Sequence, residues 1–385
     1  MKILHVISSG GMYGAEAVIL NLSRTLNRQG HTSMLGIFSN TANPNLQLHE
    51  CALQEGIESH LISCRGQIDR AVPASIRALA ASTGADLIHA HGYKADVYVH
   101  LAMRGTRTAV VSTCHNWLDE NWLVWMYGVV DRLVLRRYKA VVAVSEEVKR
   151  RLIGSGVSPA KVHFIRNGID LRPFEAAVPS LRDPGAAPEI LWVGWVGRLS
   201  REKGPGIFLR AVANVHVEFP DARFMLVGEG PDRIKIERLI GELGIGDRVQ
   251  LLGRRADMPA VYASFDVMVS SSLREGLPMA ILEGMGSGLP WVATSVGDVP
   301  TVVRDGETGI LVPAEDVERL AVAVGDLLRN AEERARMGGA ARRLMVSEFS
   351  AERMAREYLR VYRASAAHDV ELEAGIENAA SGGTH

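Results

Sequence analysis

Residues 1–26 read MKILHVISSGGMYGAEAVILNLSRTL, which is an apolar run, a glycine-rich turn and an amphipathic segment in that order. The apolar run from Lys2 to Ile7 predicts a buried β-strand. Val18, Leu22 and Leu26 recur at intervals of four, which places them on one side of a helix. A short apolar strand followed by a helix is the repeating unit of a parallel sheet covered on both faces.

The same alternation continues along all 385 residues and predicts an α/β fold of two doubly wound domains. Residues 172–189 interrupt the series, because Pro, Ala and Gly there can neither continue a strand nor fill a helix interior. The strands expected before this linker are 33–38, 60–63, 86–90, 109–113, 140–144 and 162–165, and those expected after it are 190–196, 223–227, 249–252, 266–270, 291–294 and 310–312.

These patterns set the domain boundaries. We expect a first domain over 1–171, the linker over 172–189 and a second domain over 190–349. After a break at Phe349, a helix is predicted over 350–364, where Ser350 can cap it. Residues 365–385 are acidic, rich in Gly and Ser and free of Phe, Trp and Tyr, which predicts a disordered tail.

Composition excludes several classes of protein. Charged residues make up 23% of the chain and the net charge is -1, so the broad basic field of a nucleic-acid-binding protein is missing. Three cysteines without CxxC or CxxH spacing indicate neither a disulfide framework nor a zinc site, and they favour a reducing compartment. The first apolar run is too short for a signal peptide, and no stretch has about 18 consecutive apolar residues. We therefore expect a cytoplasmic protein, at most peripheral to a membrane.

One charged loop of the second domain follows the expected strand 190–196. It reads GRLSREKG, residues 197–204, and leads into a helix. Arg198 and Lys203 flank the helix start, where backbone N–H groups and the helix dipole favour an anion. A diphosphate would fit there, and an ordinary surface loop with solvated charges is the competing interpretation. The next strand ends in Gly228-Glu229-Gly230-Pro231, which lacks the third glycine of a nicotinamide-binding fingerprint.

The most informative stretch is LREGLPMAILEGMGSGLP, residues 273–290. Pro278 can begin a helix directly after the loop, which leaves Glu275 in the loop and Glu283 about two turns into the helix. Ionised carboxylates accept hydrogen bonds from paired hydroxyls, so one glutamate suits a sugar and the other a ribose diol. Two solvated glutamates near a helix start are the competing interpretation.

In the first domain, the residues of interest lie at expected strand ends. Residues 10–16, GGMYGAE, follow the first strand, and their glycines would let a ligand approach the backbone. His89, His91 and His115 suggest a metal hypothesis, but no carboxylate accompanies them at ligand spacing. We expect no metal, with His89 a satisfied structural histidine.

Taken together, these motifs resemble those of the retaining glycosyltransferases of the GT-B fold, the family 4-like, group 1 glycosyl transferases. The resemblance covers Met1 to about Ala364. It implies two Rossmann-like domains that face each other across a cleft, with the C-terminal helix crossing back to the first. It also implies metal-independent transfer, without a cofactor, of a hexosyl-type group from a nucleotide-diphosphate sugar to a glycan or lipid-linked acceptor, in cell-surface polysaccharide or glycolipid synthesis. The departing phosphate takes the acceptor proton, so no protein nucleophile is expected.

The resemblance also implies a role for individual residues. The catalytic set is His115, Arg198, Lys203 and Glu275. The donor-binding set is Gly11, Gly14, Gly197, Gly228, Arg254, Gly276, Leu277, Pro278 and Glu283, and the acceptor-side set is Glu16, His91, Tyr93 and Asn116. Where the family often has Gly-Gly-x-Pro-Glu, this chain has GDVPT at residues 297–301, so the resemblance assigns no contacts to Asp298 and Thr301.

Other interpretations stay open. Three tryptophans between Trp117 and Tyr138, followed by basic residues, favour either peripheral contact with the inner face of a membrane or a helix packed on the sheet. An epimerase of the same fold, or a nucleotide-sugar-binding regulatory subunit without activity, would carry similar motifs, whereas a phosphorylase would need a pyridoxal lysine motif. UDP, GDP and ADP sugars all remain open as donors.

Overall fold

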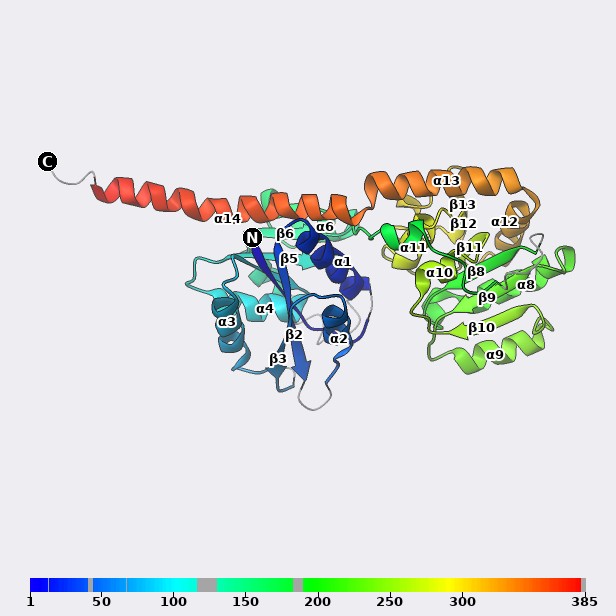
Figure 1. The fold of residues 1–385 in the computed structure, drawn as a ribbon, viewed down its shortest axis with the longest axis horizontal. Coiled ribbons are helices and arrows are strands. Elements are labelled where there is room, and N and C mark those ends of the chain that lie inside the picture. Colours follow the sequence, from blue (N-terminus) through cyan, green and yellow to red (C-terminus); the bar gives the residue numbers. More distant parts are fainter. Residues whose placement is uncertain (13, 41–43, 67, 116–129, 183–189, 382–385) are drawn as a thin grey trace. The chain divides into compact units, whose positions relative to one another are not determined.

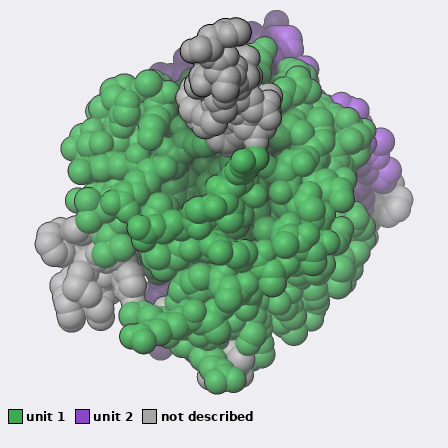
Figure 2. All heavy atoms as spheres, turned by 90° about the vertical axis from the view of Figure 1, so that its left-hand side faces the viewer, with its two compact units in different colours: residues 1–168, 351–385 green, residues 169–350 purple. Residues whose placement is uncertain are grey.

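The computed structural model describes residues 1–12, 14–40, 44–66, 68–115, 130–182 and 190–381, the last fourteen of these in backbone only (Figure 1). The chain forms two compact units. Unit 1 comprises Met1–Gly168 and Ala351–His385, and unit 2 comprises Ile169–Ser350 (Figure 2). Among the helices of the described residues, none has both the length and the apolar run that a membrane span requires.

A seven-stranded sheet in the order β3-β2-β1-β4-β5-β6-β7 forms the centre of unit 1, and all of its strand pairs are parallel. The strands are β1 (Lys2–Ile7), β2 (Thr32–Asn40), β3 (Ser59–Cys64), β4 (Leu87–His91), β5 (Ala109–Cys114), β6 (Ala140–Ala143) and β7 (Val162–Phe164). Helices connect them as the alternating pattern predicted. They are α1 (Gly14–Arg28), α2 (Gln47–Gln54), α3 (Val72–Thr83), α4 (Tyr93–Met103) and α6 (Glu146–Gly154), with the short η1 (Pro159–Lys161).

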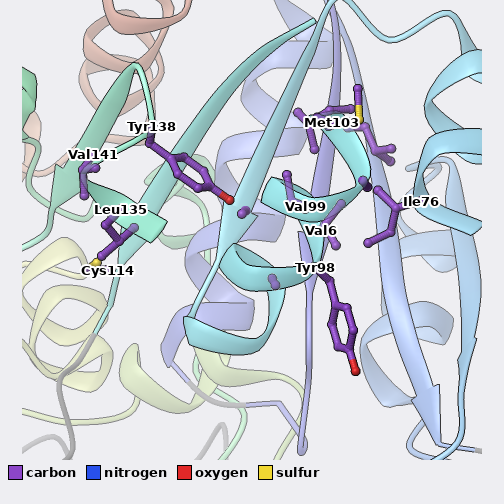
Figure 3. Packing of buried hydrophobic residues seen from close by; sticks show 14 of the residues in the cluster. Val6, Ile76, Tyr98, Val99, Met103, Cys114, Leu135, Tyr138 and Val141 are labelled. Carbon is purple, nitrogen blue, oxygen red and sulfur yellow. The ribbon is translucent and has the colours of Figure 1, made fainter. Parts of the chain in front are cut away.

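Apolar side chains hold the helices of unit 1 on the sheet. Val6 of β1 packs with Ile76 of α3 and with Tyr98 and Val99 of α4 in one buried cluster (Figure 3). The residues predicted to share one face of α1, Val18, Leu22 and Leu26, are all buried, which confirms the helical period. Burial of each such side chain contributes about 1.5–3 kcal/mol.

The end of the chain differs from the sequence prediction. Helix α14 runs over Ala351–Ser381 and packs on α1 and β5 of unit 1. The sequence predicted that this helix ends at residue 364 and that 365–385 form a disordered tail. Residues 365–381 contain no proline and a single glycine, Gly375, and they are rich in Ala and Glu, which favour continuation of a helix.

Unit 2 contains a second parallel sheet, of six strands in the order β10-β9-β8-β11-β12-β13. The strands are β8 (Trp192–Val196), β9 (Arg223–Val227), β10 (Val249–Gly253), β11 (Val267–Ser270), β12 (Trp291–Thr294) and β13 (Gly309–Val312). The helices are α7 (Arg172–Glu175), α8 (Pro205–Glu218), α9 (Arg233–Glu242), α10 (Met258–Tyr262), α11 (Met279–Gly286), α12 (Val317–Arg329) and α13 (Ala331–Glu348), with η2 (Arg201–Lys203) and η3 (Val299–Thr301). Two doubly wound sheets are therefore present, as predicted.

Part of the expected linker belongs to unit 2. Helix α7 packs on α10, and Arg182 Nε donates to the Ser264 carbonyl at 2.7 Å. The backbone N–H groups of Ser180 and Leu181 both donate to Ser264 Oγ at 3.1 Å. These contacts fix the described residues 172–182, and residues 183–189 lie outside the described part of the chain.

The segment 117–138 is described only from residue 130. Residues 130–135 are helical, and Leu135 and Tyr138 are buried in the core of unit 1 (Figure 3). Tyr138 Oη donates to the Asp96 carbonyl at 2.8 Å, whereas Val130 and Leu133 are exposed. The described end of this segment packs against the sheet, and its three tryptophans fall outside the described residues.

Candidate functional site

The loops at the carboxyl ends of the unit 2 strands approach one another so closely that glycine is required. Gly204 has φ +64° before α8, and a Cβ there would lie 2.1 Å from the Ser271 carbonyl oxygen. A Cβ on Gly228 would lie 1.9 Å from the Gly197 carbonyl oxygen. Of the predicted donor-binding glycines, Gly197 and Gly228 are thus brought together where β8 and β9 end.

Lys203 and Glu275 bind each other in this loop cluster. Lys203 Nζ lies 2.6 Å and 2.7 Å from the two carboxylate oxygens of Glu275, and Ser272 Oγ donates to Glu275 Oε1 at 2.7 Å. The Glu275 side chain is 7% exposed and that of Lys203 is 28% exposed. The sequence implied separate partners for these residues, a sugar and a diphosphate. The fold joins them into a charge-assisted pair with one open side.

Arg198 and Arg254, by contrast, are exposed. Among the described residues, no hydrogen bond or ion pair engages the exposed Arg198 guanidinium. Gly276 is also exposed, and Leu277 and Pro278 are partly so where they lead into α11. Pro278 is the N-cap of that helix, which begins at Met279, one residue after the start predicted at Pro278. Helix N-termini present backbone N–H groups without intrahelical partners, which suits phosphate oxygens.

Glu283 lies on α11, as the sequence predicted, and it has its own partner. Tyr262 Oη donates to Glu283 Oε2 at 3.1 Å. Burial raises the pKa of the Glu283 carboxyl to about 7, although the tyrosine hydrogen bond opposes the shift. Near neutral pH this carboxyl therefore takes up or releases a proton easily.

The GDVPT stretch at 297–301 lies beside Glu275 of the Lys203–Glu275 pair. A Cβ on Gly297 would lie 1.8 Å from the Glu275 carbonyl oxygen, so this loop runs along the backbone that carries Glu275. Thr301 Oγ1 donates to the Asp298 carbonyl at 2.6 Å and closes the turn that becomes η3. The GDVPT stretch thus approaches the Glu275 backbone closely and forms a locally bonded turn.

In unit 1, the loop between β1 and α1 is organised by Ser9. Its hydroxyl lies 2.9 Å from the Gly11 carbonyl and 3.0 Å from Glu16 Oε1. Glu16 is buried in the first turn of α1, which begins at Gly14. The structure therefore brings Gly11, Gly14 and Glu16 together. Of the other predicted acceptor-side residues, Tyr93 begins α4 and is 48% exposed, and Asn116 lies outside the described residues.

Four histidines gather on one face of the unit 1 sheet. The strand register sets His5 beside His89 and Ile7 beside His91. His91 lies between two imidazoles, with Nε2 3.0 Å from His5 Nδ1 and Nδ1 3.0 Å from His115 Nε2. His89 is satisfied as predicted, since Nε2 lies 2.7 Å from Thr113 Oγ1 and Nδ1 lies 2.7 Å from Tyr362 Oη.

Burial keeps these imidazoles neutral. It lowers the pKa of His5 to about 3 and that of His115 to about 4. The pKa values of His89 and His91 are also lowered well below the usual range, first by burial and then by neighbouring imidazoles. At neutral pH the cluster therefore presents hydrogen-bonding nitrogens and no charge.

A cavity of about 640 Å³ lies at the carboxyl ends of β1, β2 and β3. Lys94 reaches over it, with Nζ 3.2 Å from the Gly66 carbonyl and 5.6 Å from the centre of the Phe38 ring. Of the predicted acceptor-side residues that the structure describes, Glu16, His91 and Tyr93, none lines it. Its lining is mainly polar, namely Ser8, Ser9, Gly10, Phe38, Asn40, Pro44, Asn45, Leu46, Gln47, Glu50, Cys64 and Lys94.

Sequence reasoning missed the residues that support the predicted ones. Ser272, Tyr262 and Ser9 hold Glu275, Glu283 and Glu16, and His5 extends the histidine cluster. Only His5 carries a usable signal, because it is a polar residue inside an otherwise apolar strand. Hydroxyl partners from distant loops leave no such pattern.

Two family models match the chain, each over one part of it. The model for Glycosyltransferase Family 4 matches residues 12–172, and the model for Glycosyl transferases group 1 matches residues 190–330. The first ends close to the boundary of unit 1, and the second lies within unit 2.

Similar proteins cover most of the chain. N-acetyl-alpha-D-glucosaminyl L-malate synthase of Bacillus anthracis is 26% identical over 92% of this chain and 94% of its own length. Alpha-maltose-1-phosphate synthase of Mycolicibacterium smegmatis is 30% identical over 72% of this chain and 79% of its own. Among solved structures, Anabaena Alr3699/HepE in complex with UDP has a TM-score of 0.80 at 23% identity, covering 94% of this chain and 100% of that one. That likeness shows the fold.

Proposed function

We propose that this chain, which belongs to the group 1, family 4 glycosyltransferases of the GT-B fold, is a retaining and metal-independent hexosyltransferase. The donor is a nucleotide-diphosphate sugar and the acceptor is a glycan or a lipid-linked glycan. The protein acts in the cytoplasm, at or near the inner face of the membrane, in polysaccharide or glycolipid synthesis. Glycosyltransferase activity follows from membership of the family. We propose in addition the retaining mechanism, the independence from metal, the donor, the acceptor and the location.

The observation that carries this proposal is the Lys203–Glu275 pair between the ends of β8 and β11. Glu275 fixes the Lys203 ammonium at 2.6–2.7 Å and leaves its remaining donor capacity for an anion. The exposed guanidinium of Arg198 precedes the same helix start. Two cations and helix N–H groups can stabilise the charge on a departing diphosphate, which is the task that a divalent metal performs elsewhere.

Each remaining group of the site receives a role in this proposal. Both carboxylate oxygens of Glu275 bond Lys203, and their other lone pairs accept hydrogen bonds from hydroxyls of the transferred sugar. Glu283 in its ionised form accepts from the ribose diol, while the N-terminus of α11 receives phosphate oxygens. In unit 1, His115 binds the transferred sugar.

The acceptor occupies the cavity in unit 1. Amide and hydroxyl side chains line it together with the carboxylate of Glu50 and the ammonium of Lys94, a set that suits a polyhydroxylated ligand. Two of the acceptor-side residues expected from the sequence, Glu16 and Tyr93, lie next to this cavity instead of in it, since Ser9 of its lining bonds Glu16 and Tyr93 precedes Lys94.

Calorimetry against UDP-, GDP- and ADP-sugars, with and without a chelator, tests the donor half. UDP comes first because the structurally similar Anabaena protein binds it. We expect selective binding of one donor that the chelator does not change and that Lys203→Ala weakens about tenfold or more, since a charge-assisted bond is lost. Loss of binding with the chelator would contradict metal independence. Binding without turnover on any acceptor would indicate a regulatory subunit.

A further inference from the structure

Three imidazoles in unit 1 form a hydrogen-bonded chain that runs from His115, a partly exposed residue, to His5, a fully buried one. His115 Nε2 lies 3.0 Å from His91 Nδ1, and His91 Nε2 lies 3.0 Å from His5 Nδ1. His91 is 4% exposed and His5 is 0% exposed. At the inner end, His5 Nε2 is buried, and no hydrogen-bond partner for it is found among the described residues.

The tautomers of the three rings are coupled because the rings are neutral. A neutral imidazole has one N–H and one bare nitrogen, and each bond needs one of each. The chain therefore has two arrangements. Either all three rings carry their proton on Nδ1, or all three carry it on Nε2.

The inner end decides between them. With the protons on Nε2, the buried N–H of His5 would lack an acceptor. With the protons on Nδ1, His5 Nε2 is only an unfilled acceptor. Buried N–H groups without a partner are rarer in folded proteins than unfilled acceptors, which favours the arrangement with the protons on Nδ1.

We propose that His5 and His91 are positioning residues that hold His115 as its Nδ1–H tautomer. His5 Nδ1–H donates to His91 Nε2, and His91 Nδ1–H donates to His115 Nε2. His115 then presents an N–H donor at Nδ1. The next step rests on the proposed function. The Nδ1–H of His115 donates to a hydroxyl oxygen of the transferred sugar, and His91 and His5 fix both the ring plane and the direction of that hydrogen bond.

A metal site is the alternative use of the same cluster. His5, His89 and His91 have ligand nitrogens that lie within 4.8 Å of one another. Both nitrogens of His89 are already bonded, to Thr113 and Tyr362, and both nitrogens of His91 are bonded to imidazoles. An ion bound by all three rings would have to displace a hydrogen bond at two of them, so the hydrogen-bonded chain fits the geometry better.

Nitrogen NMR of the full-length protein, labelled with ¹⁵N-histidine and free of donor, tests the tautomers directly. We expect Nδ1–H and bare Nε2 at His5, His91 and His115. His5→Leu removes the first donor, so His115 should lose its single tautomer. His5→Asn places an amide N–H near the lost Nδ1 and should restore it. His89→Asn is the matched control, equally buried but outside the chain, and should leave the His115 signal unchanged.

Turnover gives the second readout. Removing a group that orients a metal-bound histidine commonly costs about 10- to 100-fold. By the same orienting effect, His5→Leu should lose about tenfold in kcat, at the low end of that range, whereas His5→Asn should stay within about threefold of wild type. Nε2–H at His115 in the wild-type spectrum would overturn the proposal, as would one equivalent of Zn²⁺ bound in a manner that depends on His5. The wild-type spectrum needs neither donor nor folded variants, so its result stands even if the proposed function fails.

Discussion

The Lys203–Glu275 pair in unit 2 and the His5–His91–His115 chain in unit 1 both hold a predicted functional residue in place, but they do so with different physics. The pair consists of full opposite charges, with the lysine partly open to solvent. The imidazole chain is neutral because burial lowers the pKa of each ring. It acts through the direction in which its N–H groups donate. Charge stabilises a leaving group, whereas direction orients a ring. Loss of the first should therefore cost more than loss of the second.

The largest effect should come from breaking the ion pair. We expect Lys203→Ala to lower kcat by about a hundredfold or more, because preorganised donors contribute about 3–4 kcal/mol to stabilisation of the transition state. Steady-state kinetics measure this. Lys235→Ala removes a 79%-exposed lysine that pairs with Asp232, and it should leave kcat unchanged.

A double-mutant cycle then shows whether the pair acts as one unit. Because Glu275 directly bonds Lys203, the combined loss in Lys203→Ala with Glu275→Gln should be clearly smaller than the product of the single losses. If the two single losses multiply in the double variant, Lys203 and Glu275 act independently. The comparison with the histidine chain would then concern Lys203 alone and not the ion pair.

A smaller effect is expected at Glu283, where charge depends on pH. With its pKa raised to about 7, the ionised fraction rises from about a tenth at pH 6 to about nine-tenths at pH 8. Donor binding through the ionised form should therefore tighten by about tenfold over that range, as measured by calorimetry at each pH. In Glu283→Gln, donor binding should be weak and should no longer change between pH 6 and pH 8. A steep profile in Glu283→Gln would assign the titration to another group.

The smallest effect concerns stability and a third cluster, the buried carboxyls of Asp96 and Asp131. Burial raises the pKa of Asp131 to about 7 and that of Asp96 well above its usual range. The folded state thus keeps protons that the unfolded chain loses above about pH 4, so stability should fall as pH rises toward 7. We expect Asp96→Asn to raise Tm at pH 8 by about 2–4 °C for each kcal/mol of repulsion and desolvation removed.

Calorimetric melting at pH 5 and pH 8 measures this gain. The increase should shrink at pH 5, where the carboxyls are protonated in the folded wild type. Asp221→Asn, an exposed aspartate, should show no difference between the two pH values. An equal gain at both would point to packing as the cause.

Much of the fold could be predicted because strands and helices leave periodic patterns. The strand segments and the buried face of α1 follow from spacing. Lys203 and Glu275 follow from their loop positions, and Glu283 follows from its place in the helix after the loop. The sequence could not predict that Lys203 and Glu275 bind each other, because 72 residues separate them and only the strand order β8-β11 brings their loops together. The cavity and the role of His5 depend on loop conformation and strand register, which no local pattern carries.

The route of the chain through unit 1 has a consequence for its synthesis. Tyr362 on α14 occupies His89 Nδ1, and Tyr358 lies 3.1 Å from Thr113 Oγ1, so the last long helix completes the polar core beneath the histidines. A ribosome delivers those tyrosines only after all of unit 2 has been made. Unit 2 is a continuous stretch and can fold as soon as it emerges, whereas the polar contacts of β4 and β5 must wait until α14 has been made. A truncation within α14 would therefore damage β4 and β5, which are translated before unit 2.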